Sequence, residues 1–213
     1  MPENFYRFDK TEVESISALK GANSWYTIND AGNQPLFACH VVGSCLGGTT
    51  TFHRSRGDDQ VLFRLEPKRK ILNLTHYVSE GTSGARLATI GLFTSHGMKV
   101  STPTDQELYR IVDPQGKLDK FMQDVLEGCC TAYAIVDGDR IIGNIERHPR
   151  PEQEHKEPPQ GLFGKLLRSA MKALGRDWCI ELKEDGRAIS DPRPLLATMI
   201  LLLEQTIASD QAN

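Results

Sequence analysis

The feature that most constrains the fold is a nearly continuous apolar run from Leu195 to Leu203, interrupted only by Thr198. Asp191 and Pro192 precede the run and are typical of a helix N-cap and first turn, so we expect a helix over 191–208. Its apolar residues fall on every face, which predicts burial all round. As a helix the run would extend about 14 Å, against the roughly 30 Å hydrocarbon core of a bilayer. A helix surrounded by strands inside a barrel therefore fits better than a membrane span.

A recurring hairpin unit precedes this helix. Each unit has an aromatic or apolar strand, an acidic or Asn residue, a turn that contains glycine, and a return strand; it occurs over 25–42, 108–116, 133–146 and 178–189. Asp-Gly and its longer variants supply the positive φ that hairpin turns need. With an irregular strand pair over 61–74 and a strand over 85–90, the chain has roughly ten to twelve short strands, which favours an antiparallel sandwich or barrel.

We therefore expect a mainly β protein with one barrel domain over 25–208. Residues 1–24 are expected to form a lead-in segment and residues 209–213 a short tail. A Pro-rich, charged surface loop is expected over 148–160, because it interrupts the strand pattern between two hairpins.

Composition excludes several classes of protein. The 213 residues are 39% hydrophobic and carry a net charge of -3, so the chain is too apolar for disorder and has no global basic field for nucleic acid. The segment Met1–Phe5 has neither the basic nor the apolar region of a secretory signal. None of the five cysteines has CxxC or zinc-like spacing, which favours reduced thiols in a cytoplasmic protein.

A second helix is expected over 161–176, where no acidic residue occurs. At about 100° per residue, its four basic residues fall within about 80° of arc and the rest of the surface is apolar. This pattern suits an anionic membrane surface. The alternative is that the apolar face packs against the barrel and the basic stripe is merely solvated. The candidate lipid-binding residues are Leu162, Phe163, Lys165, Leu166, Arg168, Lys172 and Arg176.

No catalytic or metal-binding constellation is evident. The histidines show no HExxH or paired metal spacing, and the sequence around Ser44 does not satisfy GxSxG. We expect no catalytic residues, no metal and no cofactor. The basic residues Arg54, Arg56, Lys68, Arg69 and Lys70 are interpreted as a solvated face more than as a phosphate site.

The order of these features resembles the Tubby C-terminal-like superfamily, in particular its phospholipid scramblase and LURP-one-related branches. The resemblance covers roughly 25–208 and rests on hairpins of the Tyr-x-Ile-x-Asp kind, then Trp178-Cys179-Ile180-Glu181-Leu182, then Asp191-Pro192-Arg193 leading into the apolar helix. It implies a closed twelve-stranded barrel threaded by the C-terminal helix. It also implies membrane-linked roles, namely phosphoinositide binding as in Tubby proteins or the lipid scrambling proposed for scramblases.

Two departures bear on calcium. Where scramblases carry an acidic calcium-binding stretch before the last helix, this chain has only Asp177, Glu181, Glu184 and Asp185. An EF-hand starting at Asp113 would need glycine where Leu118 stands. Calcium dependence and scrambling therefore do not follow from the resemblance.

The leading hypothesis is a non-enzymatic Tubby-like or scramblase-like domain that binds anionic membrane or phospholipid headgroups. It would be cytoplasmic and attach peripherally to the inner face of the membrane. One alternative is a soluble protein-interaction or regulatory domain without lipid activity, with 161–176 packed on the barrel or on a protein partner. A second is an enzyme whose site at the barrel mouth uses His53, His76 or His96.

Overall fold

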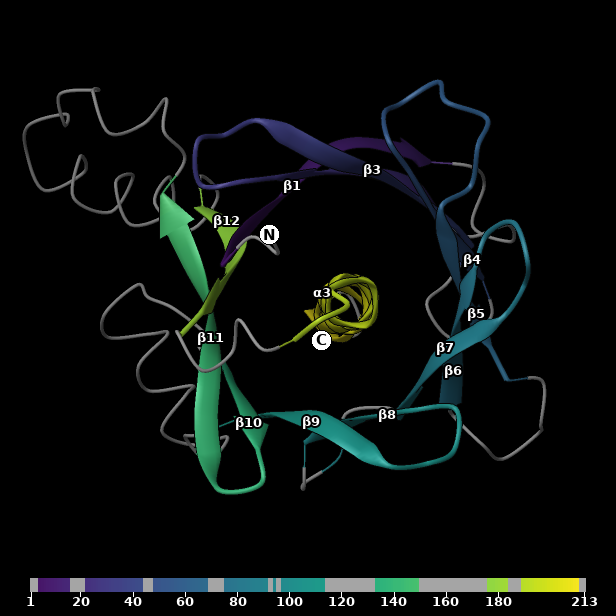
Figure 1. Cartoon of the computed structure of the whole chain (residues 1–213). Helices are drawn as coiled ribbons and strands as arrows, with labels where there is room; N and C mark the ends of the chain where they lie inside the picture. The colour runs from purple at the N-terminus through teal and green to yellow at the C-terminus, as the bar shows by residue number, and fades with distance from the viewer. Residues whose placement is uncertain are drawn as a thin grey trace, which may run out of the picture.

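The computed structural model describes residues 4–15, 22–43, 48–68, 75–91, 94, 97–113, 133–149, 176–183 and 189–210. Within these residues, twelve antiparallel strands close into a barrel with a helix along its middle (Figure 1). The strand order around the barrel is β1-β12-β11-β10-β9-β8-β7-β6-β5-β4-β3-β2. The mainly β fold class and the closed twelve-stranded barrel are confirmed.

The strands follow one another around the wall, each joined to the next by a connection at one end of the barrel. Their bounds are β1 (Phe5–Ser15), β2 (Ala22–Asn29), β3 (Pro35–Val42), β4 (Thr49–His53), β5 (Phe63–Pro67), β6 (Thr75–Glu80), β7 (Arg86–Gly91), β8 (Met98–Ser101), β9 (Glu107–Val112), β10 (Tyr133–Asp137), β11 (Arg140–Pro149) and β12 (Arg176–Leu182).

Two of the expected hairpins with acidic-glycine turns form, β2–β3 and β10–β11. In the β10–β11 turn, Gly138 has a φ of 58°, which a residue without Cβ adopts at little cost. In the β2–β3 turn the Asp30 side chain accepts the backbone N–H of Gln34 at 2.8 Å. Short-range turn chemistry therefore sets the register of both hairpins.

The expected lead-in over 1–24 is wrong, because the barrel begins with β1 at Phe5. β1 pairs with β2 on one side and β12 on the other, so it closes the wall. Its inward residues Tyr6 and Phe8 are buried beside the charged, outward Arg7. That alternation is typical of a half-buried strand, but no acidic-glycine turn marks it.

Four strands were not among the expected ones: β1, β4, β6 and β8. The return strand expected over 70–74 lies outside the described residues, and β5 pairs with β6. β12 pairs with β1 and β11 rather than with a return strand ending at Ile189, which belongs to no strand. β11 extends to Pro149, into the segment expected to be a loop.

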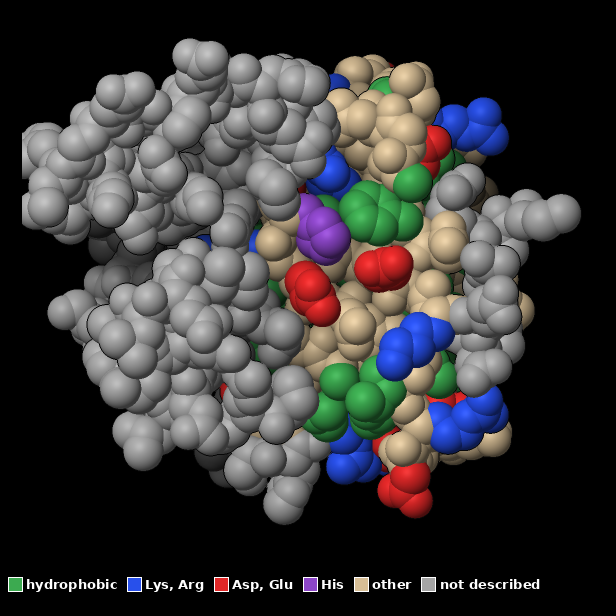
Figure 2. All heavy atoms as spheres, turned by 90° about the vertical axis from the view of Figure 1, so that its left-hand side faces the viewer, with side chains coloured by type: hydrophobic (Ala, Val, Ile, Leu, Met, Phe, Trp, Pro, Cys, Tyr) green, Lys and Arg blue, Asp and Glu red, His purple; other side chains and the backbone are tan. Residues whose placement is uncertain are grey.

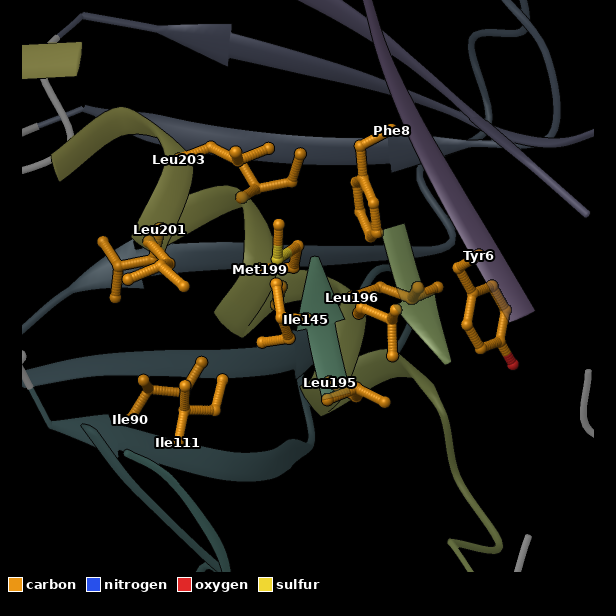
Figure 3. Close-up of a cluster of buried hydrophobic side chains, with 14 of the residues drawn as sticks. Tyr6, Phe8, Ile90, Ile111, Ile145, Leu195, Leu196, Met199, Leu201 and Leu203 are labelled. Carbon is orange, nitrogen blue, oxygen red and sulfur yellow. The ribbon is translucent and has the colours of Figure 1, made fainter. Parts of the chain in front are cut away.

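The helix α3 (Arg193–Asp210) confirms the expectation drawn from the apolar run. Every residue from Leu195 to Leu203 is at most 4% exposed, including Thr198. Figure 3 shows Leu196 and Met199 among side chains from the wall, with Tyr6 and Phe8 on one side. Because the wall surrounds the helix, every helical face finds apolar partners. Among the described residues, no helix is both long enough and apolar enough to cross a bilayer.

The barrel has two ends that we name after residues of α3. At the Asp191 end the helix begins, and the connections 30–34, 54–62, 81–85, 102–106 and 138–139 lie there together with residues 189–192. At the Glu204 end, Glu204 of α3 lies beside Lys10 of β1. Strands β1, β3, β5, β7, β9 and β11 have their C-terminal ends there, and each is followed along the chain by a strand that begins at that end.

Truncating the buried helix tests this packing. Leu196→Ala is expected to lower the free energy of unfolding by about 2–5 kcal/mol, because a fully buried leucine leaves a cavity between helix and wall. Urea denaturation measures the change. Ile141→Ala serves as the control, because Ile141 is 48% exposed on the outer wall. It should stay within about 0.5 kcal/mol of the unaltered protein, and equal losses for the two variants would contradict the buried helix.

Candidate functional site

The residues proposed for lipid binding lie almost wholly outside the described part of the chain. This holds for Leu162, Phe163, Lys165, Leu166, Arg168 and Lys172. Arg176, the last residue of the expected helix, is the first residue of β12 and pairs with Pro149 of β11. The segment 150–175 is therefore the β11–β12 connection, and both of its ends are fixed on neighbouring strands at the Glu204 end.

The wall on which this connection starts carries both signs of charge. Figure 2 views the side of the barrel formed by β11 and β12 and shows acidic, basic and apolar side chains around one histidine. On this wall the His148 ring meets the Phe5 ring edge-on, with centroids 5.9 Å apart. The described surface here is mixed rather than a single basic field.

The histidines considered for a barrel-mouth enzyme do not converge. His53 follows the inward Phe52 on β4, so it points outward, and its ring lies 6.2 Å from that of Trp25. His76 shares the inward face of β6 with Val78 and borders a hollow beside α3. The wall separates the two rings, and His96 lies outside the described residues.

Basic residues expected to form a solvated face are engaged with aromatic rings on the outer wall. Trp25 stacks on His40, with centroids 4.3 Å apart and planes at 6°, and the Arg56 guanidinium lies 5.4 Å from the Trp25 ring centre. Lys68 lies over the Tyr77 ring at 5.6 Å. Such contacts are cation–π interactions that hold the cations along the wall. Arg54 is exposed, and residues 69 and 70 lie outside the described part.

A partly buried polar cluster fixes α3 at the Glu204 end. The Tyr26 hydroxyl donates to Glu204 Oε1, and Lys10 Nζ lies 3.5 Å from the same oxygen. Burial raises the pKa of the Cys39 thiol well above its ordinary value, and the nearby Glu204 charge raises it further. The hollow that Glu204 and His76 border has a volume of about 10 Å³, close to the minimum for one water. This cluster anchors the helix and leaves no room for a ligand.

A charged clamp holds the helix at the Asp191 end. The Asp191 carboxylate accepts the Arg193 backbone N–H at 3.0 Å, and the Arg193 Nε and Nη2 donate to it at 2.9 Å each. Arg193 Nη1 also lies 3.7 Å from Glu80 Oε1 on β6. The hydrogen bonds to Asp191 raise the pKa of Arg193. The clamp thus satisfies a free N–H of the first helical turn and ties the helix to the wall.

Two cavities flank the segment that leads into the helix at this end. The Arg193 cavity has a volume of about 440 Å³ and is bordered by Phe37, Gln60, Val61, Leu62, Phe63, Glu80, Thr82, Asp191, Pro192 and Arg193. Its wall depends on Gly81, because a Cβ there would lie 1.8 Å from the Val61 carbonyl oxygen. Gly81 N–H donates to the Leu62 carbonyl at 2.9 Å, which joins the β6–β7 turn to the 54–62 connection.

The second cavity, the Tyr109 cavity, has a volume of about 330 Å³. It lies on the other side of the same segment, against β7, β9, β10 and β11. Its lining is mostly apolar, with hydroxyls and two carboxylates, and consists of Leu87, Thr102, Leu108, Tyr109, Asp137, Ile142, Ile189, Ser190, Asp191 and Pro194.

Tyr109 is the unusual residue of this cavity. The side chain is 3% exposed, and its buried hydroxyl forms no hydrogen bond of ordinary length, although Thr198 lies near it. Burial raises the pKa of Tyr109 far above its ordinary value, Thr198 lowers it and the Asp191 carboxylate raises it. The phenol therefore stays neutral, and its hydroxyl lies inside the barrel near α3, closed off from the cavity.

The described residues contain no site suited to thiol or metal chemistry. Cys39 and Cys179 are free and buried, and burial, with Asp177 adding to it and Arg7 opposing it, raises the pKa of Cys179 to about 12. A thiol with so high a pKa is a poor nucleophile at neutral pH. The described residues contain no group of three or more His, Cys, Asp or Glu placed to hold a metal ion.

Comparisons with protein-family models, with curated proteins and with solved structures find nothing that matches this chain. What the two ends of the barrel can bind is therefore argued from their own residues.

The sequence interpretation named Asp191 as a helix cap but missed its second role as one arm of the clamp. Arg193, two residues later, could have indicated this role, because its planar guanidinium can form paired hydrogen bonds with a carboxylate. Tyr109 was seen only as part of a strand. Nothing in the sequence marks its hydroxyl as buried near Thr198, because β9 and α3 lie far apart in the chain.

The clamp predicts a specific loss of stability. Asp191→Ala is expected to lower the free energy of unfolding by about 1–2 kcal/mol, because it removes the acceptor for the first helical N–H and the partner of Arg193. Asp191→Asn, which keeps an oxygen for that N–H, should lose less. Asp139→Ala, at an exposed turn, is the control and should change stability by less than about 0.5 kcal/mol. Equal effects of the three variants in urea denaturation would rule out the clamp.

Proposed function

We propose that this chain is a Tubby-like barrel of the phospholipid scramblase or LURP-one-related kind that binds anionic membrane or phospholipid headgroups without catalysing a reaction. The closed twelve-stranded antiparallel barrel with a C-terminal helix inside it supports the proposal, because the resemblance implies this architecture. The protein would be cytoplasmic and attach peripherally to the inner face of the membrane.

The observation that carries the proposal is the basic, acid-free segment 161–176. Four basic side chains near anionic lipid would each contribute about 1 kcal/mol at low salt, and apolar residues beside them would add burial in the interface. Such a contact is reversible and weakens as salt screens the charges.

The position of the segment in the fold is compatible with this role. Both ends of the β11–β12 connection leave the wall as a strand pair, Pro149 beside Arg176. The barrel would thus serve as a stable support for whatever the connection contacts.

The burial of α3 removes the other apolar candidate for membrane contact. Leu195 to Leu203 is the longest nearly continuous apolar run of the chain, and it is covered by the wall on all sides. Attachment to lipid would therefore depend on surface residues, and the basic segment is the strongest such candidate.

A liposome experiment tests the proposal. The protein is expected to co-sediment with vesicles of phosphatidylcholine and phosphatidylserine at low salt, to be released as salt rises, and to stay in solution with phosphatidylcholine alone. The double variant Lys165→Glu, Lys172→Glu should lose most of the binding, because it reverses two of the four charges.

The control keeps the same change in net charge elsewhere. Arg54→Glu with Lys183→Glu alters two exposed residues near the Asp191 end and should bind like the unaltered protein. Equal, negligible sedimentation with vesicles that contain phosphatidylserine and with vesicles of phosphatidylcholine alone would contradict the lipid proposal. It would favour the protein-interaction alternative. Equal losses in the two double variants would show that net charge, not this segment, controls binding.

A further inference from the structure

Basic side chains gather around Tyr77 on the outer wall of β5, β6 and β7. These strands are neighbours in the barrel and stand on the opposite side from β11 (Figure 1). Leu65, Val78 and Ala88 point inward and are buried, so the residues that alternate with them point outward. We name this outward group the Tyr77 surface; it consists of Arg64, Lys68, Tyr77, Ser79 and Arg86.

Tyr77 holds two cations in place. The Arg86 guanidinium lies over the Tyr77 ring, with its carbon 3.7 Å from the ring centre, and Lys68 Nζ lies 5.6 Å from the same centre. Such cation–π contacts restrict the two side chains without neutralising their charges. Because the guanidinium is already ordered, pairing it with a carboxylate costs less conformational entropy than pairing a free side chain.

A third cation comes from β5. Arg64 lies opposite Ser79 of β6, and Ser79 lies opposite Arg86 of β7, so the Cα atoms of the two arginines are about 10 Å apart. Arg64 Nη2 donates to the Gly81 carbonyl at 3.1 Å, which fixes the side chain without pairing its charge. Three positive charges therefore converge on one part of the wall.

The protein's own acids do not neutralise these cations. Among the described residues, no carboxylate forms an ion pair with any of the three. Glu80 of β6 faces Arg193 instead, at 3.7 Å, which leaves Glu66 as the remaining acid of the three strands. The connection 69–74 lies outside the described residues, but its sequence contains no acid. The surface therefore favours an anionic partner.

The aromatic rings of this wall disfavour nucleic acid as that partner. Single strands bind by stacking their bases on exposed rings, but Arg86 covers one face of Tyr77 and His40 covers one face of Trp25. Affinity for nucleic acid also grows with the number of phosphates contacted, and three cations on a chain of net charge -3 can contact few. Arginine clusters that pair with carboxylates instead recognise acidic protein segments.

The same wall is poorly suited to a membrane. Peripheral attachment combines basic residues with apolar ones that enter the interface. Among the described residues, the exposed large hydrophobic side chains are Val42, Leu108 and Ile141, and none of them lies on β5, β6 or β7. A contact that depends on charge pairing alone fits this surface better.

From these observations we propose that the Tyr77 surface binds an acidic segment of a partner protein, whose carboxylates pair with Arg86 and Lys68 beside Tyr77 and with Arg64. This interaction does not rest on the proposed membrane contact, because it uses another part of the chain. Tyr77→Leu changes no charge and should leave vesicle sedimentation unaltered, so that failure of either proposal can be told from failure of the other.

Titration of the full chain with short labelled probes tests the proposal. A blocked peptide of alternating glutamate and serine is expected to bind saturably at low salt and to be released as salt rises. The same peptide with glutamine in place of glutamate should bind at least tenfold more weakly, because it lacks the carboxylates. An oligothymidylate of the same charge as the acidic peptide should also bind more weakly. Fluorescence anisotropy measures the three affinities.

Two pairs of variants locate the binding. Arg86→Ala should weaken binding of the acidic peptide roughly threefold to tenfold, as expected for a lost charge-assisted pair. Arg140→Ala removes another exposed arginine, on β11, and should bind normally. Tyr77→Leu should weaken binding to a similar degree, because both cations lose the ring that orders them, whereas Tyr77→Phe keeps the ring and should bind normally.

Each result has a defined meaning. No saturable binding of the acidic peptide, or equal binding of the glutamine peptide, would overturn the proposal. Unaltered affinity in Arg86→Ala, or an equal loss in Arg140→Ala, would also overturn it, because binding would then not depend on this surface. Arg86 is exposed, so this pair decides the question even if Tyr77→Leu does not fold. Tighter binding of the oligothymidylate, or loss of vesicle sedimentation in folded Tyr77→Leu, would assign the surface to nucleic acid or to lipid instead.

Discussion

The structure depends on one constraint: a helix that is apolar on every face must be covered on every face. An open sheet would leave part of α3 exposed, whereas a closed wall covers it completely. The wall also depends on the helix, because a barrel of twelve strands is wide enough to enclose an interior that must be filled. The inward positions of the wall, such as Ile90, Ile111 and Ile145, belong to the same buried apolar cluster as the residues of α3 (Figure 3). Closure also removes the free strand edges that would otherwise pair with other chains.

Polar contacts at the two ends fix where the helix stands along the barrel. Apolar packing alone is nondirectional and would tolerate small shifts of α3 along its axis. The Asp191–Arg193 clamp reaches Glu80 at one end, and Glu204 meets Tyr26 and Lys10 at the other. The cavities at the Asp191 end lie beside this clamp, so the same residues that hold the helix also shape the space next to it.

Much of the fold could be predicted from local signals in the sequence. The hairpin at Gly138 and the buried helix both follow from patterns within about 20 residues, where turn chemistry and periodicity act directly. The strand β1 could not be placed in this way, because its partner β12 lies at the other end of the chain. The Tyr109 cavity is hidden for the same reason, since β7, β9, β10, β11 and the segment before α3 all contribute to its lining. The basic segment is the reverse case: a clear local pattern whose lipid-binding role stays a prediction.

The central claim is that α3 is the core of the barrel and not an appendage to it. Native-state hydrogen exchange measures this directly, because it reports the free energy of opening for each amide. The backbone amides from Met199 to Leu203 should exchange only through global unfolding, with the same opening free energy as the amides of the wall strands β9 and β11. If the helical amides instead open at a markedly lower free energy while the wall stays protected, the barrel is stable without its helix and the account is contradicted.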